Sequence, residues 1–369
     1  MQKIKNIEFL RVLGCLSVIL VHLFCNSKLH GLFPDIEIYN KLSTMTSNGQ
    51  KAVDLFFMLS GFFFAWKLDI MQTSWIFIKN KLIRLYPLLV FIIALLFIFS
   101  LFGTVKFMLY DNILSLLCIN GTGLVMKNGN VGHFWYVSAM LWILFLFFYL
   151  RKNYERKTVN LIIAILVMFS YTFIIHANKG RIDYHTLTFS HIFNIGMLRA
   201  FGGIGAGYFI GEWYKENTEK IKHWKLSIMQ TVIISGLEFV CLYFIINNLM
   251  LHKLQYNNHI IFIAAFICII VLFLLGKGLF SKHLNHDIFP KIAKYSYSIY
   301  MIHWPILEHL KGSVWKNNAE YVYAHPILNV VFTLALIVIS GILTYHFVEA
   351  PCANYLKKRA ETRMAVGGG

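Results

Sequence analysis

Long apolar segments separated by charged loops constrain the fold of this chain more than any other feature. As a helix, each segment is long enough to cross a hydrocarbon layer of about 30 Å. Hydrophobic residues make up 58% of the 369 residues and charged residues 14%, which is too apolar for a soluble protein of this length. We therefore predict an all-α, multi-pass integral membrane protein with about ten transmembrane helices. These are expected near residues 7–25, 52–68, 86–103, 132–150, 159–176, 191–213, 226–247, 258–276, 296–311 and 327–347.

The lysine and arginine residues alternate between loops, and this alternation predicts the orientation in the membrane. Those on the side of Lys3 and Lys5 are roughly twice as numerous as those on the opposite side, as the positive-inside rule requires of a cytoplasmic face. Both termini are therefore expected in the cytoplasm. The net charge of +17 follows from this loop pattern, so we expect no nucleic acid partner.

We expect one transmembrane domain over residues 1–352 and a cytoplasmic tail over residues 353–369. The final glycines of the tail are either a flexible end or residues added by cloning. The first apolar segment is similar to a secretory signal, but Glu8 and Arg11 interrupt it and no small-residue cleavage site follows it. We therefore predict a retained helix. The cysteines have no metal-type spacing, and no metal is expected.

Two ionisable residues of the first apolar segment, Arg11 and His22, are the strongest functional candidates. Intramembrane charge is costly, so such residues mark functional sites by default. Their spacing is about three helical turns, which places them on one helix face and roughly 16 Å apart. A cation and a titratable imidazole would then share one track through the membrane. The alternative is that Arg11 extends to the headgroups and His22 only ends the helix.

A second group of charges is expected at the cytoplasmic side. Lys81 and Arg84 precede the third apolar segment, and we expect them to meet Arg11 where two helices begin. Helix N-termini add backbone N–H donors, so this corner would suit a phosphate-bearing ligand. The alternative is that Lys81 and Arg84 are ordinary positive-inside charges.

Other polar residues are expected at the outer side or deep within the membrane. Asp54, His133 and Trp135 begin two of the predicted helices, where they are either site residues or a cap and interfacial residues. Arg199 and Glu238 lie within predicted spans and need partners that the sequence does not identify.

Two further segments have a structural interpretation. His303 and Trp304 precede Pro305, which interrupts the ninth segment and frees a backbone carbonyl group. The glycines at four-residue spacing in the sixth segment predict close helix packing. These glycines are Gly203, Gly207 and Gly211.

Six motifs, taken in chain order, resemble the signature of the acyltransferase 3 family of integral membrane acyltransferases. The first is Arg11 with His22, preceded by Glu8. The resemblance departs from the family at Lys81, where an arginine is usual, and lysine cannot make the bidentate contact of a guanidinium. The other motifs are Val53-Asp54-Leu55-Phe56-Phe57-Met58-Leu59-Ser60-Gly61-Phe62, Arg84-Leu85-Tyr86-Pro87, Gly132-His133-Phe134-Trp135-Tyr136, Tyr295-Ser296-Tyr297-Ser298-Ile299-Tyr300 with His303-Trp304-Pro305, and Val348-Glu349-Ala350-Pro351.

The resemblance implies transfer of an acyl group, usually acetyl from acetyl-CoA, to a hydroxyl of a cell-envelope glycan or a related lipid-linked acceptor. It implies a stand-alone enzyme in the cytoplasmic (inner) membrane of a bacterium, with acyl-CoA as co-substrate and no permanently bound cofactor. The expected partners are the lipid bilayer, acyl-CoA and the acceptor. The expected site residues are His22 and Asp54 for catalysis, Glu8, Arg11, Lys81 and Arg84 for the donor, and His133, Trp135, Arg199 and His303 for the acceptor or in support.

Two chemical roles of His22 stay open on the sequence. A histidine titrates near neutrality, so it can take the proton of an attacking hydroxyl. It can instead accept the acyl group and pass it on. In either case Asp54 is expected to orient the imidazole and Glu8 to orient Arg11.

Two other classes of protein fit parts of the sequence. A transporter or flippase of an envelope lipid or glycan would also have deep charges and a broken helix, but such folds tend to have internal repeats, and none is found here. A membrane scaffold without catalysis would leave the track from Arg11 to His22 unexplained.

Overall fold

Helices make up nearly all of the structure. The computed structural model describes residues 4–25, 28–68, 74–120, 132–177, 182, 188–189, 193–251, 259–355 and 358. Its first half contains α1 (Lys5–Phe24), α2 (Leu29–Leu32), α3 (Glu37–Thr46), η1 (Gly49–Lys51), α4 (Ala52–Lys67), α5 (Ser74–Leu101), α6 (Leu109–Leu116), η3 (Gly132–Phe134), α7 (Trp135–Asn153) and α8 (Arg156–Ala177).

The second half opens with a short antiparallel pair of strands, β1 (Thr188–Phe189) and β2 (Phe193–Asn194). The helices that follow are α9 (Ile195–His223), α10 (Ile228–Met250), α11 (His259–Leu275), α12 (Leu279–His283), α13 (Ile288–Ala293), α14 (Ser296–His309), α15 (Trp315–Asn317), α16 (Ala319–Ala324) and α17 (Pro326–Thr344). Two π-helical turns, η5 (Leu310–Val314) and η6 (Tyr345–Glu349), extend α14 and α17.

The all-α membrane fold is confirmed for the described residues, with the two short strands as the exception. Six helical stretches there are long and apolar enough to cross a membrane. They are Lys5–Leu32, Phe77–Leu101, Gly132–Asn153, Arg156–Ala177, Ile228–Met250 and Pro326–Tyr355.

The other four predicted segments are also helical but differ from these six in length or polarity. The helices α4, α11 and α14 contain 16, 17 and 14 residues. In contrast, α9 has 29 residues, but it includes Arg199 and several glycines. The helices α4, α11 and α14 are therefore too short, and α9 is not apolar enough, to be identified as spanning helices by length and hydropathy alone.

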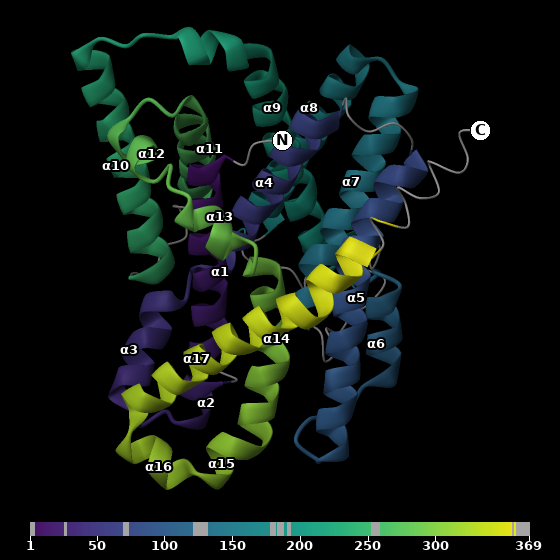
Figure 1. Ribbon diagram of the computed structural model, residues 1–369, viewed down its shortest axis with the longest axis vertical. Helices are drawn as coiled ribbons and strands as arrows, with labels where there is room; N and C mark the ends of the chain where they lie inside the picture. Colours follow the sequence, from purple (N-terminus) through teal and green to yellow (C-terminus); the bar gives the residue numbers. More distant parts are fainter. Residues whose placement is uncertain are drawn as a thin grey trace.

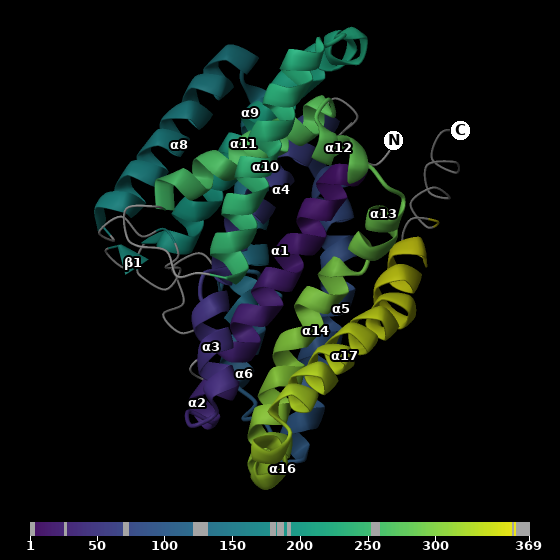
Figure 2. The ribbon, with the colours of Figure 1, turned by 90° about the vertical axis from the view of Figure 1, so that its left-hand side faces the viewer.

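The two chain halves surround α1. Figures 1 and 2 place α1 in the interior, with α14 beside its second half and α17 crossing the outside of the bundle. The start of α1 and the end of α17 lie toward the same end of the molecule, whereas α2, α15 and α16 form the opposite end.

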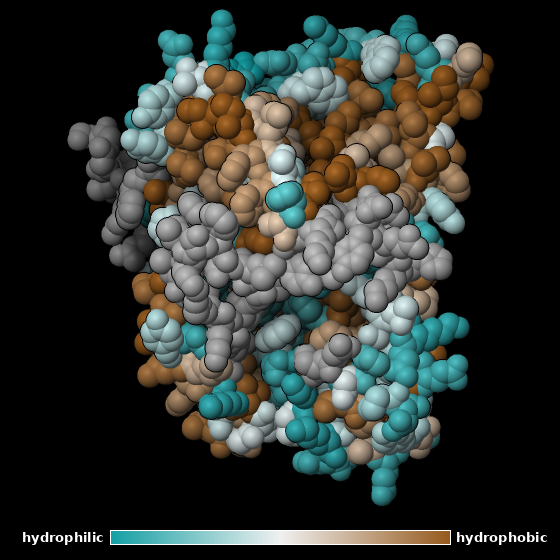
Figure 3. All heavy atoms as spheres, turned by 180° about the vertical axis from the view of Figure 1, so that it is seen from behind, coloured by the Kyte–Doolittle hydropathy of each residue, from teal (hydrophilic) through white to brown (hydrophobic). Residues whose placement is uncertain are grey.

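Several outer helices of the bundle present apolar surfaces. On α8, α10 and α17 large hydrophobic side chains are exposed, including Met168, Ile228 and Phe332. Figure 3 shows hydrophobic residues over much of the upper half of one face, with hydrophilic residues along the upper edge and at the lower end. This distribution fits a surface that faces lipid between two aqueous layers.

The glycine stripe of α9 packs against α4, as the sequence predicts. A Cβ atom on Gly207 would overlap the carbonyl group of Met58, and one on Gly61 of α4 would overlap the carbonyl group of Ile204. The two backbones therefore lie in direct contact, which only small residues allow.

Two predicted helix boundaries are corrected by the structure. The sixth segment was expected from residue 191, but α9 begins at Ile195 because the Asn194 side chain caps it, accepting from the Gly196 N–H at 2.6 Å. The third segment was expected from residue 86, but α5 begins at Ser74 and contains Pro87 in its interior.

Glu238 of α10 caps a neighbouring helix. Its carboxylate accepts from the backbone N–H groups of Phe280 at 2.9 Å and Ser281 at 3.2 Å, in the first turn of α12. A Cβ atom on Gly278 would overlap this carboxylate, so a glycine is needed there. The buried charge thus has a structural role, because a helix N-terminus stabilises an anion.

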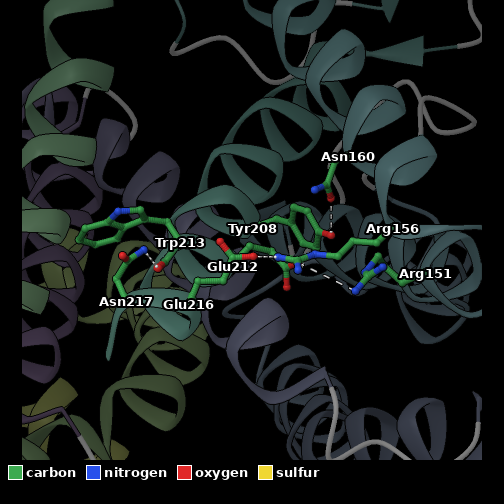
Figure 4. Close-up of polar contacts among 8 residues, drawn as sticks. All are labelled: Arg151, Arg156, Asn160, Tyr208, Glu212, Trp213, Glu216 and Asn217. Atoms are coloured by element: carbon green, nitrogen blue, oxygen red, sulfur yellow. Dashed lines mark hydrogen bonds and ion pairs between the residues drawn. The ribbon is translucent and has the colours of Figure 1, made fainter. Parts of the chain in front are cut away.

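A polar cluster joins the α7–α8 corner to α9. Arg156 Nε lies 2.7 Å from Glu212 Oε2 and the same guanidinium pairs with Glu216, while Arg151 Nη2 lies 3.9 Å from Glu212 Oε2. Figure 4 shows Arg156 lying between α9 and Arg151. Since Arg156 is 46% exposed, its ion pairs contribute little stability and mainly fix how these helices meet.

Candidate active site

Three histidines from distant parts of the chain meet beside α1. His22 lies near the end of α1, His303 in α14 and His133 in η3 at the start of α7. The ring centroids of His22 and His303 are 5.1 Å apart, and those of His133 and His303 are 5.3 Å apart. Three of the predicted site residues are therefore brought together.

Hydrogen bonds assign the tautomers of two of these rings. His303 Nδ1 bonds the carbonyl oxygen of Tyr300, so this nitrogen must carry the proton. His303 Nε2 is then an acceptor, and His22 Nδ1, at 2.8 Å, donates to it. It follows that His22 has its lone pair on Nε2, and this is the nitrogen that can take part in proton or acyl transfer.

Trp304 forms one wall of the histidine cluster. Its ring lies 5.1 Å from His22 in a T-shaped arrangement and 5.8 Å from His133 in a stacked one. Lys28 Nζ lies 4.7 Å from the Trp304 ring centroid and pairs with Glu308. Neither Lys28 nor Glu308 is predicted as a site residue from the sequence, and only the nearness of Glu308 to the His303-Trp304-Pro305 motif could have suggested one of them.

Asp54 and Arg199 form a buried ion pair. Arg199 Nη2 lies 2.7 Å from Asp54 Oδ2 and Nε lies 3.2 Å from Oδ1, and both side chains are at most 1% exposed. Trp135 lies under the guanidinium, 5.4 Å from Cζ. Arg199 therefore has the partner that its position requires. The expected orienting contact of Asp54 on His22 is corrected, because His303 holds the imidazole Nδ1 instead.

The predicted donor residues gather at the other end of α1. Arg11 Nη1 lies 2.7 Å from Glu8 Oε2, so Glu8 orients Arg11 as expected. Arg84 and Arg11 both act electrostatically on the buried carboxyl of Glu349, and Arg84 acts on Lys81. We call this group, together with Lys67 and Ser298, the basic corner.

Lys67 and Glu349 belong to the basic corner but were not predicted as site residues, although Glu349 lies in the last of the six sequence motifs. Glu8, Arg11 and Arg84 all act electrostatically on Lys67. Glu349 accepts from Ser298 Oγ at 2.5 Å and lies at the end of the π turn η6. A π turn often marks a functional site, but the sequence does not show where one forms.

The helix N-termini expected in the basic corner are absent from it among the described residues. Arg11 lies well within α1, and Lys81 and Arg84 lie more than one turn inside α5. The N–H groups there are used within the helices. Cationic side chains, rather than backbone donors, define this corner.

Aromatic rings connect the basic corner with the histidines. Arg11 acts electrostatically on Tyr136, whose ring centroid lies 5.9 Å from that of Tyr300. The Tyr300 hydroxyl donates to the His133 carbonyl at 2.7 Å.

Among the described residues, no group of histidine, cysteine, aspartate and glutamate has the arrangement of a metal site.

The fold and these clusters define a polytopic membrane protein with an intramembrane histidine site and a basic corner on the same helix. A family model described as an acyltransferase domain matches residues 4–346. The chain therefore belongs to the acyltransferase 3 family, which confirms the resemblance, and a membrane acyltransferase is the class of protein that it represents.

The chain is also similar, at low identity, to curated proteins. The chain is similar to O-acetyltransferase OatA of Staphylococcus aureus strains NCTC 8325 / PS 47 and COL, with 23% identity over 351 residues. These alignments cover 86% of this chain and 54% of the relatives, so the chain spans about half of their length. No solved structure matches it.

Proposed function

We propose that this acyltransferase moves an acetyl group from cytoplasmic acetyl-CoA to a hydroxyl of a cell-envelope glycan or a lipid-linked precursor of one. The observation that carries the proposal is the placement of the basic corner and the histidine cluster at the two ends of α1. The name of the S. aureus relatives, O-acetyltransferase, supports acetyl as the group transferred.

The basic corner suits the phosphates of CoA. Arg11, Lys67, Lys81 and Arg84 supply four cationic side chains against the two carboxylates of Glu8 and Glu349. Arginine binds phosphate through two parallel hydrogen bonds, and Arg84 is exposed on α5. Lys81 contributes a positive charge but cannot form these two parallel hydrogen bonds.

The distance between the two clusters suits an extended CoA arm. Arg11 and His22 lie on one continuous helix, so they are roughly 16 Å apart along its axis. Tyr136 and Tyr300 lie between the clusters. We propose that the thioester reaches His22 Nε2 along these rings, while the phosphates stay at the basic corner.

The proposed orientation follows from the loop charges. The basic corner and both chain ends are assigned to the cytoplasm, and His22 to the outer half of the membrane. The start of α1 and the end of α17 lie toward one end of the molecule (Figure 1), which agrees with this assignment. In this proposal α4, α9, α11 and α14 complete ten transmembrane segments in the inner membrane of a bacterium.

The test uses inverted membrane vesicles of the producing cells, supplied with acetyl-CoA labelled in the acetyl group. We expect label to enter the envelope glycan fraction and to be released by mild base, as an ester is. Vesicles with an Arg84→Ala variant at equal protein level should lose most of this label. Equal labelling with and without the protein would reject an acyltransferase role and favour the transporter or flippase.

A further inference from the structure

His133 is a buried imidazole with unsatisfied polar atoms. His133 is 3% exposed. Neither of its ring nitrogens makes a hydrogen bond of standard geometry in the described structure. Leaving such atoms unpaired in an apolar interior costs free energy. Such an unpaired buried group in a native fold points to a catalytic or ligand-binding role.

Pro305 leaves a backbone carbonyl group of α14 without its helical partner near His133. As a residue inside α14, Pro305 has no N–H to bond the carbonyl of Met301, four residues earlier. That carbonyl interacts with the His133 ring. A neutral imidazole has a proton on one ring nitrogen and a lone pair on the other, so His133 has one lone pair.

His133 also lies beside His22 but takes no part in the hydrogen bond between His22 and His303. Both His22 and His303 act electrostatically on it, and its ring stacks on Trp304 at 5.8 Å. Its backbone is held by the Tyr300 hydroxyl. The site thus contains two lone pairs on different helices, one on His22 Nε2 and one on His133.

We propose that the two histidines divide the reaction, so that His22 accepts the acyl group from the donor and His133 is the base for the acceptor hydroxyl. This inference rests on the proposed function. It makes His133 a catalytic residue in contact with the acceptor.

In the first step the His22 Nε2 lone pair attacks the thioester carbonyl carbon, and the C–S bond breaks. Coenzyme A leaves as a thiolate. The Nδ1 proton of the acylated His22 passes to His303 Nε2 along their 2.8 Å hydrogen bond. The result is a neutral acyl-imidazole beside a protonated His303.

In the second step the acceptor oxygen attacks the acyl carbon and its proton passes to His133. The bond between the acyl carbon and His22 Nε2 breaks, and Nδ1 recovers its proton from His303. His133 then releases its proton, which balances the thiolate. The net reaction converts a thioester and an alcohol into an ester and a thiol.

The test measures coenzyme A release in the first turnover and label transfer to glycan, with purified protein in detergent and then with vesicles. The wild type should release coenzyme A in a rapid stoichiometric burst. His133→Ala should retain the burst and hold labelled acyl on the protein, while its transfer to glycan falls by about 10²-fold or more. His133→Phe, which keeps a ring but has no lone pair, should behave in the same way.

A matched control is His309→Ala, which removes a histidine of α14 that contacts Phe99 and Thr104 instead of the cluster. It should retain both burst and transfer. The inference is overturned if His133→Ala and His133→Phe retain transfer, if both lose the burst, or if the wild type transfers label without a burst. A wild type with neither burst nor transfer would reject the proposed function itself.

Discussion

His22 Nδ1 and His303 Nε2 lie 2.8 Å apart although 281 residues separate them in the chain. This hydrogen bond joins α1 to α14 and fixes the tautomer of His22, which is the residue that we propose to carry out the acyl transfer. Because the His303 ring is itself held by the Tyr300 carbonyl, the backbone of α14 sets the direction of the His22 lone pair.

A first prediction follows for His303. His303→Ala removes the acceptor that holds His22 in its tautomer, so we expect acyl transfer to fall by about 10²-fold or more. The apparent KM for acetyl-CoA should stay near the wild-type value, because the basic corner is intact. Steady-state kinetics at several donor concentrations would separate these two effects. A change in KM alone would mean that His303 serves donor binding.

The second prediction concerns the fork geometry of Arg11. Arg11→Lys keeps the charge but loses the two parallel hydrogen bonds to a phosphate. We expect acetyl-CoA binding to weaken about tenfold or more, as loss of a charge-assisted bond of roughly 1.5–3 kcal/mol implies. Calorimetry with coenzyme A on purified protein measures this directly. Unchanged affinity in both Arg11→Lys and Arg11→Ala would move the donor site elsewhere.

The buried pair of Asp54 and Arg199 allows its structural role to be separated from a catalytic one. Asp54→Leu leaves a buried guanidinium uncompensated, which should lower the free energy of unfolding by about 3–5 kcal/mol. Adding Arg199→Met should recover much of this loss, because both charges are then gone. Denaturation in detergent checks stability, and transfer assays on the double variant check catalysis. A stable double variant without activity would support the predicted catalytic role of Asp54.

Helix packing gives a prediction with a close control. Gly207→Ala places a methyl group against the Met58 backbone, so α4 and α9 must separate and the folded yield should fall sharply. Gly236→Ala on α10 meets nothing within 4 Å and should be neutral or slightly stabilising, since alanine favours helices. Fluorescence-detected size exclusion would compare the two. Equal yields would show that the α4–α9 contact is less tight than described.

Periodicity and charge were enough to predict those parts of the fold that depend on single segments. The apolar segments all coincide with helices, the glycine stripe of α9 is a packing face, and Glu8 orients Arg11. Each of these depends on residues within one helix turn or one repeat. Local spacing carries that information.

Contacts between distant segments could not be derived in this way. The partner of His22 was expected to be Asp54 but is His303, and Arg199 takes the Asp54 carboxylate. The start of α5 was set too late, because its first turns carry lysines that resemble a loop. Such pairings depend on how helices cross, which single-segment patterns do not contain.

The central claim is that His22 performs the transfer, and the most direct measurement is the acetyl content of envelope glycan by mass spectrometry. At matched protein levels in the membrane, His22→Ala should abolish the acetyl mass shift, while the protein still inserts because its apolar helices are unchanged. His22→Gln keeps a hydrogen bond but has no basic nitrogen, so it should be equally inactive. Full acetylation of the glycan in cells that contain only His22→Ala would contradict this account.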